Sequence, residues 1–264
     1  MNQRLYLGTN TKMYKGIAET VDYLERLAQN TADLQAEPME LFVLPSFTAL
    51  AAASASSHGR IRLGAQNLCW EGEGQFTGEI SPGMLQETGA EIAMIGHSER
   101  RRIFGETDEM ENRKVLCALR YQLTPLLCVG ETNEEKNSGQ ANAVLDRQLE
   151  LALQGVSSSD ALRLRIAYEP VWAIGVNGMP ADKAYAAEKH GVIRQKLADL
   201  FGKTVSEQIP ILYGGSVNLD NSPLLIQEDN IDGLFIGRSA WEANRFNDII
   251  RSVLNAWKKK RERF

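Results

Sequence analysis

The sequence predicts a single (β/α)8 barrel that spans residues 1–264, and three observations lead to this fold class. The chain has 264 residues, 43% of them hydrophobic, and α/β barrels commonly reach this length as one domain. Eight short β-type runs alternate with longer helical stretches, which is typical of a parallel sheet. No long Pro/Ser-rich linker divides the chain. An open doubly wound sheet is the second interpretation.

The predicted strands are brief runs rich in Val, Ile, Leu or Tyr, and each ends at Gly, Pro or a polar residue. In chain order they are RLYLGTN (4–10), LFVLPS (41–46), IRLGAQN (61–67), EIAMIGH (91–97), TPLLCVGE (124–131), RIAYEP (165–170), IPILYGGS (209–216) and GLFIGRS (233–239).

Helices are predicted between these strands, where apolar residues recur at helical spacing. In the first stretch Ile17, Val21, Leu24 and Leu27 share one face. The main predicted helices lie at 16–30, 81–89, 108–121, 142–155 and 186–201.

Composition and charge exclude several classes of protein. The formal net charge of -5 argues against a general nucleic-acid binder, which usually carries a basic stripe. The basic end KKKRERF carries a single aromatic residue, and its lysines and arginines suit the C-terminal end of a helix, so a membrane or RNA role is not favoured. Cys69, Cys117 and Cys128 show no zinc-ligand spacing and are typical of reduced thiols. With no signal-peptide stretch and no membrane-length apolar run, we expect a cytoplasmic protein.

Polar and glycine-rich motifs gather where the predicted strands end. Active residues of α/β barrels lie at the carboxyl ends of the strands, on the loops that lead into the helices. Eight motifs occur there in order: GTNTKM, AQN, FTGEISPGML, GHSERRRIFGE, CVGET, AYEPVWAIG, YGGSV and DGLFIG. In this order they resemble the triosephosphate isomerase family, and the resemblance covers nearly the full chain. It implies a TIM barrel that isomerises a small phosphorylated sugar through an enediolate.

The resemblance assigns a role to each of five polar residues. Glu169 is the candidate base, although a lone Glu at a strand end is more often a solvated carboxylate. His97, at the predicted start of a helix, is the candidate electrophile, because the positive end of a helix disfavours a charged imidazole. Lys12 is the cation near the developing oxyanion, Glu99 orients it, and Asn10 positions the reacting oxygens. The other histidines, His58 and His190, match no motif and are expected to be structural.

Backbone groups near Gly175, Ser216 and Gly237 form the expected phosphate cradle, with Arg238 beside them at its edge. Taken singly, such glycine-rich turns are often only turns. The segment 170–181, PVWAIGVNGMPA, is the expected lid, and an ordinary loop is the alternative. No metal site is predicted, and no cofactor is expected.

A long loop, NLCWEGEGQFTGE at 67–79, follows the third predicted strand. The resemblance implies a homodimer in which this loop reaches the second subunit and Thr77 supports the partner's Asn10 and Lys12. Trp70 is a candidate anchor of that contact, unless it packs within its own chain.

Three features depart from the usual family pattern. Thr11 stands where an aromatic residue is common, the lid ends in VNGMPA, and Arg238 replaces a second glycine. The stretches YGGSVN and IDGLFIGRSAW, with NGMPA, are similar to a paralogous branch, the erythrulose-phosphate isomerases. This narrower resemblance implies L-erythrulose 1-phosphate as substrate and D-erythrulose 4-phosphate as product, with Thr11 giving space and polarity for the added hydroxymethyl group.

Alternatives stay open at this point. Triose phosphates are the alternative substrate. An inactive barrel that only binds a phosphorylated ligand is the alternative from another class, although the retention of Glu169, His97 and Lys12 argues against it. A Schiff-base aldolase is disfavoured, because no predicted strand carries a lysine at its centre.

Overall fold

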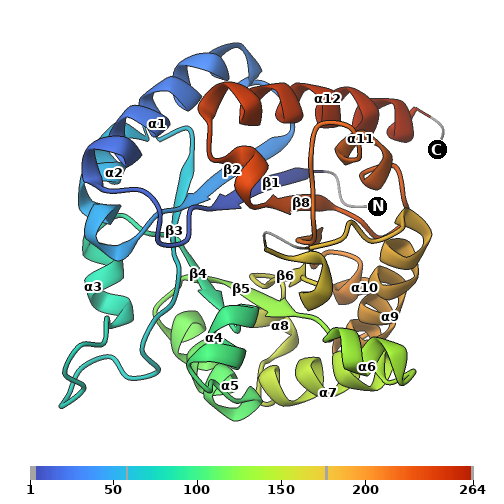
Figure 1. Ribbon diagram of the computed structural model, residues 1–264. Helices are drawn as coiled ribbons and strands as arrows, with labels where there is room; N and C mark the ends of the chain where they lie inside the picture. Colours follow the sequence, from blue (N-terminus) through green and yellow to red (C-terminus); the bar gives the residue numbers. More distant parts are fainter. Residues whose placement is uncertain (1–3, 58, 176–177, 263–264) are drawn as a thin grey trace.

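The protein forms a closed barrel of eight parallel strands in sequence order, as the computed structural model in Figure 1 shows. The structure describes residues 4–57, 59–175 and 178–262. Strand β1 pairs with both β2 and β8, so the sheet has no free edge. This closure confirms the barrel and excludes the open doubly wound sheet.

All eight predicted strands are present. Their bounds are β1 Leu5–Asn10, β2 Met39–Leu44, β3 Arg62–Ala65, β4 Ile92–Ile95, β5 Thr124–Val129, β6 Arg165–Tyr168, β7 Ile211–Tyr213 and β8 Gly233–Ile236.

Helices follow the strands and surround the barrel (Figure 1). The α-helices are α1 Ile17–Asn30, α2 Leu50–Ser56, α3 Pro82–Glu87, α4 Ser98–Ile103, α5 Asp108–Arg120, α6 Asn133–Asn137, α7 Ala141–Ala152, α8 Ser158–Ala161, α9 Lys183–Phe201, α10 Lys203–Ser206, α11 Ser222–Leu225 and α12 Ala243–Arg261. Short 3-10 turns are η1 Ala32–Leu34, η2 Phe47–Ala49, η3 Val171–Ala173 and η4 Arg238–Ala240. No helix in the described ranges is long and apolar enough to cross a membrane.

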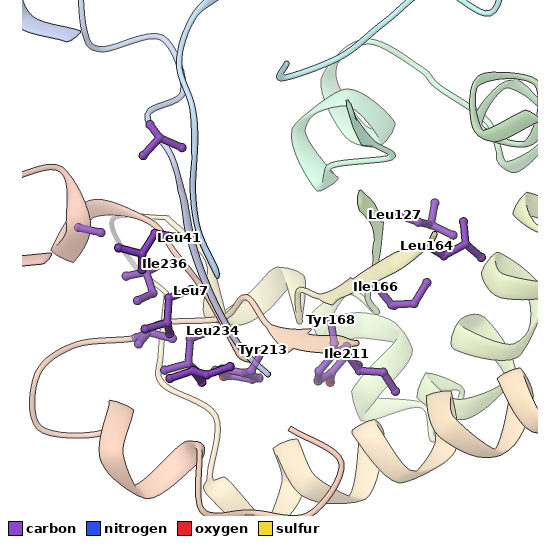
Figure 2. Close-up of a cluster of buried hydrophobic side chains, with 14 of the residues drawn as sticks. Leu7, Leu41, Leu127, Leu164, Ile166, Tyr168, Ile211, Tyr213, Leu234 and Ile236 are labelled. Atoms are coloured by element: carbon purple, nitrogen blue, oxygen red, sulfur yellow. The ribbon is translucent and has the colours of Figure 1, made fainter. Parts of the chain in front are cut away.

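The core has two parts because side chains alternate along each strand. Outward-facing residues such as Leu7, Ile166 and Leu234 pack against the helices, and Figure 2 shows this cluster. The inward-facing set fills the barrel itself and consists of Phe42, Leu44, Ile92, Met94, Leu126, Cys128, Ala167, Leu212 and Phe235. Gly8 leaves room for the Phe42 ring, since a Cβ at Gly8 would lie 2.1 Å from it. The barrel is therefore packed, and a ligand has to bind at one of its ends.

Candidate active site

One cavity at the carboxyl ends of the strands brings together the nine residues predicted to be catalytic or to hold the phosphate. It measures about 720 Å³. The predicted residues that line it are Asn10, Lys12, His97, Glu99, Glu169, Gly175, Ser216, Gly237 and Arg238. They come from the ends of β1, β4, β6, β7 and β8, so closure of the barrel places them around one space. The cavity is also lined by Tyr14 and Trp241, to which sequence reasoning assigned no role.

Glu169 follows β6 directly and is buried, with 4% of its surface exposed. Its backbone N–H donates to the Val129 carbonyl over 2.8 Å. Two glycines allow the close packing around it. A Cβ at Gly130 would lie 2.0 Å from the Glu169 carbonyl oxygen, and a Cβ at Gly214 would lie 2.8 Å from its Cγ. Its Oε2 has no hydrogen-bond partner among the described residues. The carboxylate is thus held in place while one oxygen stays available.

His97 is the N-cap of α4, as expected from its place in the sequence. Its Nδ1 accepts a hydrogen bond from the backbone N–H of Glu99 over 3.2 Å. In a neutral imidazole one nitrogen accepts and the other donates, so this bond places the proton on Nε2. That Nε2 lies 3.7 Å from Oε1 of Glu169. The tautomer therefore presents an N–H donor beside the carboxylate.

Lys12 adopts a left-handed backbone conformation, with φ of 52°, which is uncommon for a residue with a side chain. Its N–H donates to Oδ1 of Asn10 over 2.7 Å, and its carbonyl accepts from Nε2 of Gln66 over 2.8 Å. Its ammonium forms a 2.7 Å ion pair with Glu99. Partial burial raises the pKa of Glu99, but the hydrogen bond from Lys12 and the positive charge of Lys12 outweigh it, so the pKa lies below its usual value. Glu99 therefore stays ionised and holds the lysine.

The predicted cradle residues line the same cavity. No described residue accepts a hydrogen bond from the backbone N–H of Gly175 or Ser216. The carbonyl of Ser216 accepts from Nδ2 of Asn221 over 2.9 Å, which holds this loop in place. Arg238 is exposed, and its guanidinium forms no hydrogen bond or ion pair with any described residue. Free donors and an uncompensated cation suit an anionic group such as a phosphate.

A comparison with known protein families shows to which family the chain belongs. A family model described as triosephosphate isomerase matches residues 5–253. The chain belongs to the triosephosphate isomerase family. It is therefore an isomerase, of a family that acts on small phosphorylated sugars.

Relatives in the triosephosphate isomerase family carry two different names. A protein of Rhizobium etli named L-erythrulose-1-phosphate isomerase is 47% identical over 94% of this chain and 92% of its own length. A triosephosphate isomerase of Citrifermentans bemidjiense is 42% identical over 92% of this chain and 96% of its own. Among solved structures, triosephosphate isomerase from Bartonella henselae matches with a TM-score of 0.84 and 35% identity, covering 94% of this chain and 98% of that one.

The segment 170–181, which the resemblance to triosephosphate isomerases predicted to be a lid, is anchored at its start. The Trp172 indole donates to Glu131 over 2.8 Å, and the Lys136 ammonium lies 3.5 Å above the Trp172 ring. Glu131 is fully buried. Residues 176 and 177 of the segment lie outside the described residues. Trp172 therefore has specific partners in the segment that follows β5, Glu131 just after the strand and Lys136 in α6.

The 67–79 loop, expected to reach a second subunit as in triosephosphate isomerases, extends from the barrel between β3 and α3 (Figure 1, teal). Its tip is exposed from residue 73 to residue 79, including Thr77. Trp70, at its base, lies under the Arg113 guanidinium at 4.3 Å, and Arg113 also pairs with Glu71. Trp70 is thus partly packed against its own chain, and its contact with a second subunit stays a prediction.

The structure corrects the role that was expected for Thr11. The expectation that it enlarges the cavity is wrong, because Thr11 is fully buried and does not line the cavity. Its hydroxyl donates to the Leu44 carbonyl over 3.4 Å instead. Consecutive side chains at a strand end point in opposite directions, so Asn10 faces the cavity and Thr11 faces away.

The two histidines that match no motif were expected to be structural. His58 lies outside the described residues. His190 is buried with its Nδ1 2.9 Å from the Asn230 carbonyl oxygen, which is a structural position.

Proposed function

We propose that this isomerase interconverts L-erythrulose 1-phosphate and D-erythrulose 4-phosphate by proton transfer through an enediolate. The reaction type is supported by the carboxylate of Glu169 and the Nε2–H of His97, which lie 3.7 Å apart in one cavity. The substrate is supported by the R. etli relative, which is named for L-erythrulose 1-phosphate and shares 47% of its residues.

The proposed roles follow from what each group offers. Glu169 takes the proton from C3 of the substrate, next to the C2 carbonyl, and later returns it to C2. The electrons of the broken C–H bond form the C2–C3 double bond, and the negative charge moves to the carbonyl oxygen. His97 and Lys12 stabilise that oxygen, and Asn10 positions it. A proton passes from the C3 hydroxyl to the C2 oxygen through His97. Because C2 and C3 exchange oxidation states, the reaction needs no external oxidant.

Binding of the phosphate is proposed to involve Gly175, Ser216 and Gly237 through their backbone, with Arg238 as the nearby cation. This leaves the ammonium of Lys12 for the reacting oxygens. The proposal gains support from the exposed guanidinium of Arg238, which is without a partner in the described structure. No metal or cofactor has a step in this scheme.

We also propose a homodimer formed through the 67–79 loop. The exposed tip carries Phe76, 40% exposed, beside Thr77, and an apolar ring on a protruding loop suits burial in a second subunit. In such a dimer Thr77 supports the partner's Asn10 and Lys12.

The test is kcat/KM for L-erythrulose 1-phosphate and for D-glyceraldehyde 3-phosphate, measured on the same preparation. We expect a clear preference for the tetrulose, because a site that bonds an extra hydroxyl can discriminate by roughly 10⁴–10⁵-fold. The name of the C. bemidjiense relative favours triose phosphates as the second candidate, and preference for the triose would establish it. Tight phosphate binding without turnover of either sugar would leave only a binding protein.

A further inference from the structure

Trp241 lies just after η4, between β8 and α12, and lines the cavity. It is partly buried. Its indole Nε1–H donates to the backbone carbonyl of Asn10 over 2.9 Å. The donor and the acceptor are 231 positions apart in the chain, so this bond exists only because β8 closes against β1.

The accepting carbonyl begins the strained turn that carries Lys12. A left-handed φ at a residue with a side chain costs free energy and persists only when the surroundings hold it in place. Three hydrogen bonds do so here, and each comes from a different donor. Trp241 binds the carbonyl of Asn10, Gln66 binds the carbonyl of Lys12, and the Lys12 N–H binds the Asn10 side chain. Of the three, the Trp241 bond ties the turn to the end of β8, beside Gly237 and Arg238.

The indole also contacts the far end of the same segment. The rings of Trp241 and Tyr14 have centroids 4.6 Å apart, with an interplanar angle of 38°. Tyr14 is 66% exposed, so the Trp241 ring covers part of an otherwise exposed side chain. Trp241 therefore touches the segment that bears Lys12 on both sides, at residue 10 and at residue 14.

We propose that Trp241 is a positioning residue, which holds the Asn10–Lys12 turn in its reactive geometry through the indole N–H. The inference rests on the proposed enediolate chemistry, in which Asn10 and Lys12 act on the reacting oxygens. Loss of the indole N–H displaces these groups at the end of β1 from the transition state, whereas the backbone bond from the Trp241 N–H to the Arg238 carbonyl, which holds the cradle end of β8, is kept in every Trp241 variant. The effect is therefore expected in kcat and not in KM.

The experiment compares four variants with the parent, each checked for folding by its Tm. Trp241→Phe keeps a ring and removes the N–H, Trp241→Gln offers an N–H without the ring, and Trp241→Leu offers neither. Trp257→Phe is the matched control, because Trp257 is buried in α12, away from the cavity. We expect Trp241→Phe to lower kcat about tenfold, as for loss of one ordinary hydrogen bond, with KM close to the parent value. Trp241→Gln should be more active than Trp241→Leu, and Trp257→Phe should keep the parent kcat.

Three outcomes would overturn the inference. Parental kcat in Trp241→Phe would show that the N–H does not matter. A rise in KM at constant kcat would mean that Trp241 supports the phosphate cradle. Equal activity of Trp241→Gln and Trp241→Leu would show that an N–H donor at this position has no effect and that only the size of the side chain matters. This pair of variants decides the question if Trp241→Phe does not fold. All variants are assayed on whichever sugar phosphate the parent prefers, so failure of the tetrulose assignment and failure of this inference are distinguishable.

Discussion

Replacing Glu169 with Gln should remove proton transfer and leave the fold intact. Glutamine has the shape of glutamate but is not a base at neutral pH. Glu169 is 4% exposed, and its Oε2 receives no hydrogen bond from the described residues, so the substitution breaks no hydrogen bond at that atom. We therefore expect an unchanged Tm. General-base catalysis commonly contributes about 10²–10⁴-fold, so kcat should fall by at least that range, equivalent to about 3–5 kcal/mol in the barrier.

Glu40 supplies the matched control for this experiment. It is also a buried carboxylate, but it lies at the start of β2, at the opposite end of the barrel. It accepts hydrogen bonds from Arg62 over 3.1 Å and from Arg165 over 2.8 Å. Glu40→Gln leaves buried Arg165 without its counter-ion, which costs about 3–5 kcal/mol of stability, so its Tm should fall while kcat is retained.

Steady-state kcat and KM for both sugar phosphates, with Tm from thermal unfolding, are measured on the parent and both variants. The two carboxylates should separate cleanly, with Glu169→Gln losing kcat and Glu40→Gln losing Tm. Turnover of Glu169→Gln within a few-fold of the parent would refute the assignment of the base. A large loss of Tm in that variant would show instead that the carboxylate is structural.

Three further predictions concern assembly, pH and metals. Deleting residues 73–78 should give a monomer with impaired activity by light scattering and assay, and a fully active monomer would contradict the proposed dimer contact. Burial lowers the pKa of His190 from 6.5 to about 3, so below pH 6.5 the unfolded chain takes up a proton that the folded chain does not. Stability from this group is present above pH 6.5 and should fall by about 1.4 kcal/mol per pH unit down to about pH 3. Urea midpoints at pH 7 and pH 5 should show this fall, and a slope that is unchanged in His190→Asn would exclude His190 as its source. Exhaustive chelation should leave kcat unchanged, and a loss that one added metal restores would overturn the metal-free scheme.

The strand ends show how far sequence reasoning reaches. Each strand is a local apolar run that ends at a Gly, Pro or polar residue, so its position could be read directly from the chain. In a closed parallel barrel all carboxyl ends meet at one face, and this single fact places Lys12, His97, Glu169 and Ser216 around one cavity. The clustering of the site thus followed from the order of the motifs together with the fold class.

Thr11 and Trp241 show where sequence reasoning stopped. Thr11 stood out as an unusual residue in a catalytic motif, but the side-chain alternation at the end of β1 directs it into the core. Trp241 stood in a motif that supported the narrower resemblance, yet nothing local indicated that its N–H meets the Asn10 carbonyl. A resemblance names the positions that matter but does not say which way each side chain points.

The sequence by itself determined the strands, the order of the catalytic motifs and the family, because these depend on local hydrophobic patterns and on matched residues in order. Only the tertiary structure decided which nitrogen of His97 accepts a hydrogen bond, the strained turn at Lys12 and the contact of Trp241 with Asn10. The physical reason is that the first group arises from interactions between neighbours in the chain. The second depends on hydrogen bonds whose geometry is set by backbone and side-chain conformation, and in the case of Trp241 on closure of β8 against β1.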